Sequence, residues 1–248
     1  MCAERRTVLN ITVRRADSSC IPITEFRLWQ VDLSDDLPGI PVLPETLLLL
    51  DLQVQERLID LRAVSELILS DLGATLQIFR LAGREHACTE FRPSRIEDCI
   101  ADLGVHVCLE AVSAQTISRN AGDGAVAETW AHSREIAVLS KQIAEESQEI
   151  DPGEAYLSGL LHAIGLLPAV LGWAAGKHGV SDFSLAGFKL AKKWSLAPFL
   201  VKFLSEMNEE QYTTLLPEIV REAHQRAVKS KIHCPLEEGI GPRLYRTS

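Results

Sequence analysis

The chain has 248 residues, of which 46% are hydrophobic and 24% charged, an ordinary mixture for a globular protein. Its formal net charge of −9 repels phosphate backbones and disfavours direct binding to nucleic acid. The six cysteines include no Cys-x-x-Cys pair, which argues against a zinc ribbon and favours reduced thiols in a cytoplasmic protein.

The first 36 residues predict a β hairpin. Apolar and polar residues alternate over 9–14, and a second extended run covers 23–31. Because an isolated hairpin is only marginally stable in water, we expect it to pack on the rest of the chain or on another chain. Trp29 in this segment is a candidate interface anchor, and packing of its ring onto the helical body is the alternative.

From Pro44 onward the apolar residues recur with helical spacing, so we expect a mostly α-helical protein with a short N-terminal β hairpin. The helical domain is predicted to span 37–233, and the tail 234–248 is predicted to be flexible. The expected helices cover 44–55, 63–70, 72–82, 94–104, 105–117, 125–147, a segment around His162, 184–194, 197–207 and 215–232.

Three acidic or hydroxyl side chains are expected at helix N-termini. Asp71 is placed to cap the third helix, and Ser94 with Glu97 forms the pattern of a capping box. Asp151 precedes a proline and, three positions later, a glutamate, which predicts an N-cap for the helix that carries His162.

The segment 155–176 has no formally charged residue and is long enough to cross a bilayer. It contains His162, Pro168 and several glycines, and its flanks lack an aromatic belt and a clear positive bias. We therefore expect a buried central helix in this segment and no membrane insertion.

The residues Leu160-Leu161-His162-Ala163-Ile164-Gly165 resemble the Leu-Leu-His-Asp-Ile-Gly motif of the HD superfamily of metal-dependent phosphohydrolases. In that superfamily the His-Asp pair places an imidazole and a carboxylate on one divalent metal ion. Here Ala163 stands at the Asp position, and a methyl group offers no lone pair to a metal.

Over most of its length the chain resembles the HDOD domain, an HD-related output domain of bacterial signalling proteins. The resemblance runs from Leu43 to about residue 232 and implies an HD-like multi-helix bundle with a regulatory role. Its motifs are Leu43-Pro44-Glu45-Thr46, Leu76-Gln77-Ile78-Phe79-Arg80-Leu81-Ala82, Trp130-Ala131-His132-Ser133 and Tyr156-Leu157-Ser158-Gly159-Leu160-Leu161-His162.

Mapped onto this sequence, the ligand positions of the HD superfamily fall at His132, at His162 with Ala163, and near His224. Helical spacing turns His132 toward the core. One interpretation is a set of buried imidazoles inherited from an ancestral site. The other is a three-histidine metal site, which requires His224 to lie close to the other two, and spacing alone does not place it.

Without its carboxylates the site is poorly suited to hard ions such as Mg²⁺, so the sequence predicts no catalytic residue, no bound metal and no cofactor. We expect a regulatory protein that acts through contacts with a protein partner, and a homo-oligomer is compatible with this. The alternatives are a metal-dependent phosphohydrolase with a remodelled histidine-only site and a small-molecule sensor that uses the vacated cleft.

Overall fold

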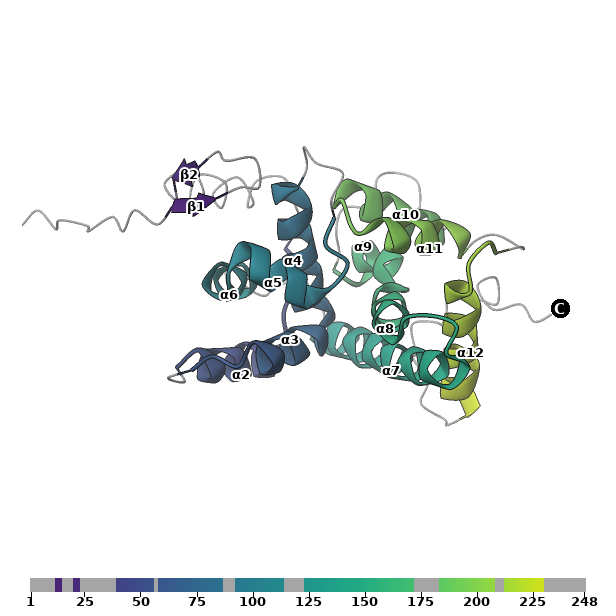
Figure 1. The fold of residues 1–248 in the computed structure, drawn as a ribbon. Coiled ribbons are helices and arrows are strands. Elements are labelled where there is room, and N and C mark those ends of the chain that lie inside the picture. The colour runs from purple at the N-terminus through teal and green to yellow at the C-terminus, as the bar shows by residue number, and fades with distance from the viewer. Residues whose placement is uncertain are drawn as a thin grey trace, which may run out of the picture. The chain divides into compact units, whose positions relative to one another are not determined.

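The computed structural model describes residues 12–14, 20–22, 39–55, 58–86, 92–113, 123–171, 183–207 and 212–229. The chain divides into two compact units, Met1–Gly39 and Ile40–Ser248. The described part of the second unit is built from helices (Figure 1), which confirms the predicted mostly helical architecture.

In the first unit, two short strands pair antiparallel. They are β1 (Thr12–Arg14) and β2 (Cys20–Pro22), with Thr12 opposite Pro22. The remainder of the predicted hairpin, including 23–31 and Trp29, lies outside the described residues. The longer hairpin therefore stays a prediction.

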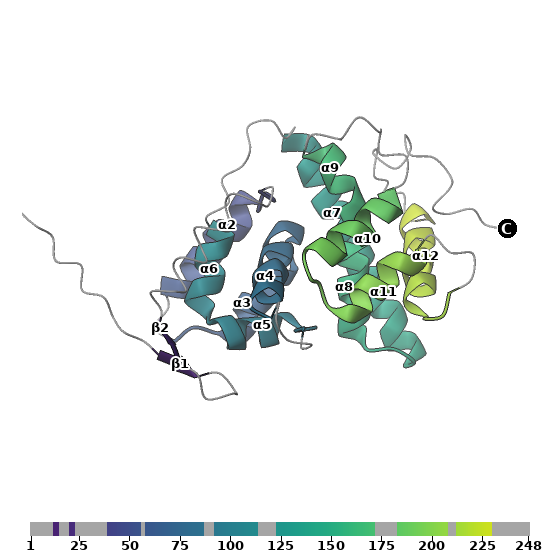
Figure 2. The same ribbon diagram turned by 90° about the horizontal axis from the view of Figure 1, so that it is seen from above.

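The helices of the second unit follow the predicted order. They are α2 (Pro44–Gln55), α3 (Leu61–Leu69), α4 (Leu72–Glu85), α5 (Ile96–Leu103), α6 (Val105–Ser113), α7 (Asp123–Ser147), α8 (Pro152–Leu161), the 3₁₀ turn η1 (Ile164–Leu166), α9 (Leu167–Val170), α10 (Phe183–Lys193), α11 (Pro198–Glu206) and α12 (Leu216–Lys229). Figure 2 shows α2–α6 on one side of this unit and α7–α12 on the other.

Helix α4 forms the centre of the first group. Every residue from Leu72 to Gly83 is buried, and the helix contacts α3, α5, α6 and α7. Two of its buried polar side chains bond to carbonyl groups: the Thr75 hydroxyl donates to Ile68 O at 2.8 Å, and the Gln77 amide donates to Ile40 O at 3.3 Å. These bonds offset the cost of burying polar atoms inside the helical core.

Asp71 links three parts of this core. It caps α4 by accepting a hydrogen bond from Ala74 N at 3.0 Å, as the sequence predicted. The same carboxylate accepts from Leu43 N at 2.8 Å and from the indole Nε1 of Trp130 at 3.1 Å. Burial raises the pKa of Asp71, while these donors act in the opposite direction.

Of the other two predicted caps, one is confirmed and one is wrong. Asp151 accepts from Glu154 N at 2.9 Å at the start of α8. Ser94 does not cap α5, because that helix begins one residue later than the capping-box pattern requires. Arg95 occupies the N-cap position and makes no side-chain cap bond.

The uncharged segment 155–176 does not form one continuous helix. Helix α8 ends at Leu161, and the chain then passes through η1 into α9, with Pro168 in the first turn of α9. Proline has no N–H for an intrahelical bond, which accounts for a new helical start there. In the described part of the chain no helix combines the length and the apolar character that crossing a membrane requires.

Candidate functional site

Three histidines from three helical elements meet in the second unit. His132 lies on α7, His162 is the C-cap of α8, and His224 lies on α12. One nitrogen from each ring lies within 4.8 Å of the others. The ring centroids are 5.4 Å apart for His132 and His162, 5.1 Å for His132 and His224, and 4.6 Å for His162 and His224. All three positions singled out in the sequence therefore belong to one cluster, called here the histidine trio.

Helix packing brings the trio together. Helix α8 lies against α7, and α12 contacts both (Figure 1). The approach of α8 to α7 depends on Gly159, where a Cβ atom would lie 2.8 Å from Ala137 Cα and 2.7 Å from the Ser140 hydroxyl. With no side chain at this position, the end of α8 brings His162 close to His132.

The hydrogen bond of His162 fixes its tautomer. Nδ1 lies 2.6 Å from the carbonyl oxygen of Gly159. A carbonyl oxygen can only accept, so Nδ1 carries a proton, and Nε2 of the neutral ring carries the lone pair. Metal-binding histidines are commonly oriented by such a bond from the second ring nitrogen to a backbone carbonyl.

His224 is held neutral by its surroundings. Burial lowers its pKa well below the ordinary value of 6.5, and the neighbouring His162 and His132 lower the pKa further. The side chain is 4% exposed. At neutral pH this ring is therefore uncharged, and a neutral imidazole is the form that binds metal ions.

The trio lacks the acidic ligand of the HD motif. Ala163 follows His162 directly and is itself buried. Among the residues that the structure describes, no carboxylate joins the three imidazoles within metal-binding distance. The arrangement can offer three neutral nitrogen ligands, and it supplies neither a carboxylate ligand nor a carboxylate general base.

The HDOD domain model matches residues 40–174, more than half of the chain. The chain belongs to the HDOD family. The matched segment contains His132, His162 and Ala163, whereas His224 lies beyond it. No curated protein matches the sequence.

Solved structures similar to this chain have low sequence identity to it. The MmoQ response regulator from Methylococcus capsulatus is 22% identical, with a TM-score of 0.63 over 83% of this chain and 93% of that chain. A virulence factor from Campylobacter jejuni is 16% identical, with a TM-score of 0.53 over 90% of this chain and 95% of that chain. A third structure, from Shewanella amazonensis, is named as a phosphohydrolase by similarity. It is 23% identical over 82% of this chain and 80% of that chain, with a TM-score of 0.37.

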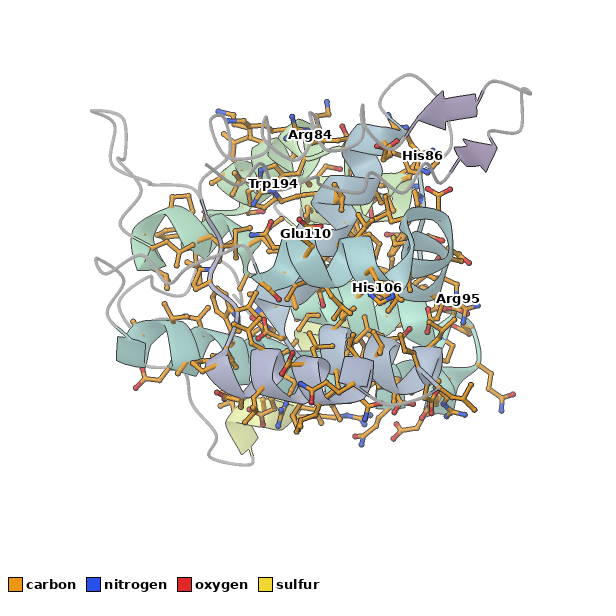
Figure 3. All side chains as sticks on the ribbon, turned by 90° about the vertical axis from the view of Figure 1, so that its left-hand side faces the viewer. Arg84, His86, Arg95, His106, Glu110 and Trp194 are labelled. Carbon is orange, nitrogen blue, oxygen red and sulfur yellow. The ribbon has the colours of Figure 1, made fainter. Side chains whose placement is uncertain are left out.

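Two features of the HDOD domain were not anticipated from the sequence. One is His86, the C-cap of α4, whose Nε2 lies 2.8 Å from the carboxylate of Asp102 on α5 (His86 is labelled in Figure 3). Sixteen residues separate the two, so no local pattern predicts the pair. The second feature is a group of exposed leucines on α2, in the segment after it and at the start of α3, called here the leucine face: Leu48, Leu49, Leu52, Leu58 and Leu61.

Proposed function

We propose that this HDOD protein is a non-catalytic regulator that acts through contacts with a protein partner. The observation that carries the proposal is Ala163 beside a trio of imidazoles that no carboxylate joins among the described residues. HD-type hydrolysis needs a metal-bound water and an acidic ligand set suited to the ion. Among the described residues, no carboxylate that could complete such a ligand set joins His162.

The burial of the trio also supports a non-catalytic role. The Nε2 atoms of His132 and His162 are both buried, and His224 is almost entirely enclosed. A catalytic metal keeps a coordination position open to water and substrate. Nitrogen atoms that solvent does not reach are poorly placed to present a metal-bound water to a phosphoester.

The leucine face supports the second half of the proposal, a role in protein contacts. Leu58 is 89% exposed and Leu48 is 61% exposed. Single exposed leucines are ordinary, whereas five exposed leucines between residues 48 and 61 favour a protein interaction site. Glu45 and Asp51 are the only charged residues of α2, so few charges accompany these leucines.

We expect the purified protein to show no phosphodiesterase activity with added Mn²⁺ or Mg²⁺, because its site lacks the carboxylates that hold these ions. The measurement is hydrolysis of bis-p-nitrophenyl phosphate and of cyclic dinucleotides. Turnover that His162→Ala abolishes and His106→Ala retains would contradict the proposal. His106 is an exposed residue of α6, remote in sequence from the trio (Figure 3).

Deleting residues 1–36 is expected to remove association with a partner or a second copy while residues 37–248 stay folded. The reason is that a short hairpin has too little core of its own and must dock against something larger. Circular dichroism reports the fold, and light scattering with chemical cross-linking reports association. The contact role of this segment fails if the truncated protein unfolds or keeps every association of the full chain.

A further inference from the structure

We propose that the histidine trio binds one late transition-metal ion of the zinc class. The sequence leaves this alternative open because the spacing of the residues does not place His224. The structure brings His224 within 4.8 Å of the other two ligand positions, counted between ring nitrogens. The inference stands on this geometry and is independent of whether the chain acts through a partner.

The distances are close to those of a formed site. With zinc–nitrogen bonds of about 2.1 Å and tetrahedral angles, ligand nitrogens lie about 3.4 Å apart. The ligand nitrogens of the trio are at most 4.8 Å apart, so the farthest pair would have to approach by about 1.4 Å on binding an ion. His132, His162 and His224 come from three separate helical elements, so the domain itself sets their spacing.

The orientation of His162 fits the same role. Its Nδ1–H donates to the Gly159 carbonyl, and Nε2 is thereby the nitrogen able to bind a metal. A backbone carbonyl in this position fixes the ring and raises the basicity of the ligating nitrogen. Gly159 also permits the close contact of α8 with α7, so one residue supports both the helix packing and the ligand orientation.

The ligand set selects the class of ion. Three imidazoles with no carboxylate suit Zn²⁺, Co²⁺, Ni²⁺ or Cu²⁺, whereas Mg²⁺ and Ca²⁺ require oxygen ligands. This set differs from the mixed imidazole and carboxylate ligands of the HD motif. A bound ion would connect α7, α8 and α12, and binding to the folded state alone would stabilise the domain.

The test uses the full-length protein, freed of metal with a chelator and titrated with Co²⁺ at neutral pH. We expect one Co²⁺ per chain, displaced by Zn²⁺ and unaffected by millimolar Mg²⁺. The visible bands should be those of nitrogen-ligated Co²⁺ without the near-ultraviolet charge-transfer bands of a thiolate. A raised melting temperature with Zn²⁺ should accompany binding.

Matched variants locate the ion. His162→Ala is expected to weaken Zn²⁺ binding by more than about 100-fold, since loss of even an outer-shell partner costs 10–100-fold. His106→Ala, and a His233→Ala, Cys234→Ser double variant, should bind as the unaltered protein does. His162 is only partly buried, which favours a folded variant, and circular dichroism checks this.

Absence of stoichiometric binding by the unaltered chain would overturn the proposal, as would equal binding by His162→Ala. Thiolate bands in the Co²⁺ spectrum would also overturn it, because they place the ion at cysteine. If His162→Ala does not fold, the spectrum and stoichiometry of the unaltered protein decide alone. Metal binding without phosphodiesterase activity would support both proposals. Absence of metal binding would contradict only the metal site, and metal-dependent hydrolysis would contradict only the non-catalytic function.

Discussion

Replacing Gly165 with alanine is expected to destabilise the domain by about 3 kcal/mol, the upper end of the usual cost of overpacking a core. Gly165 lies in η1, where a Cβ atom would overlap the carbonyl oxygen of Phe183 and lie 2.7 Å from its carbonyl carbon. It would also lie 2.9 Å from Gly187 N. All three atoms belong to the backbone of α10, so α10 and η1 would have to separate. Urea unfolding followed by circular dichroism measures the loss.

Gly124→Ala is the matched control. A Cβ atom at Gly124, in the first turn of α7, would have no atom within 4 Å. Alanine favours a helix over glycine by up to about 1 kcal/mol, so this variant should be neutral or slightly more stable. If Gly165→Ala unfolds at the same urea concentration as the unaltered protein, then η1 and α10 do not pack as closely as the structure shows.

Asp71→Ala is expected to cost about 3 kcal/mol or more, because buried donors would lose their acceptor. Those donors are Leu43 N in the segment before α2, Ala74 N in α4 and Trp130 Nε1 in α7. The substitution therefore weakens the contacts among three parts of the core at once. Thermal and urea unfolding, followed by circular dichroism and by the tryptophan fluorescence to which Trp130 contributes, measure the effect.

Asp151→Ala provides the comparison for Asp71→Ala. Asp151 is also an N-cap, but it is exposed and accepts a single cap bond, from Glu154 N. Loss of such a cap costs about 1 kcal/mol. Equal losses from the two variants would mean that Asp71 acts only as a cap, contrary to the network around it.

Much of the helical domain could be predicted because its signals are local. Apolar periodicity located the helices, and the carboxylates of Asp71 and Asp151 marked two helix starts. The interior position of His132 followed from the apolar residues on its face of α7, and its side chain is buried.

The features that the sequence could not predict depend on distant parts of the chain. The cluster of His132, His162 and His224 requires α12 to pack on α7 and α8, and residue spacing carries no information on that packing. The break after α8 was predictable in principle, since Pro168 disfavours a continuous helix. The leucine face could not be predicted because the leucines of α2 follow one another without a clear polar side, a pattern that by itself favours burial.

We propose that this HDOD domain performs no phosphoester chemistry even when its histidine trio carries a metal ion. Single-turnover hydrolysis, with the Zn²⁺-treated protein in excess over a cyclic dinucleotide or a bis-p-nitrophenyl phosphate substrate, tests it most directly. We expect product to form no faster than with Zn²⁺-treated His162→Ala protein. Among the described residues no carboxylate joins the trio, and the Nε2 atoms of His132 and His162 are buried. Product formation by the unaltered protein that His162→Ala abolishes would contradict the account.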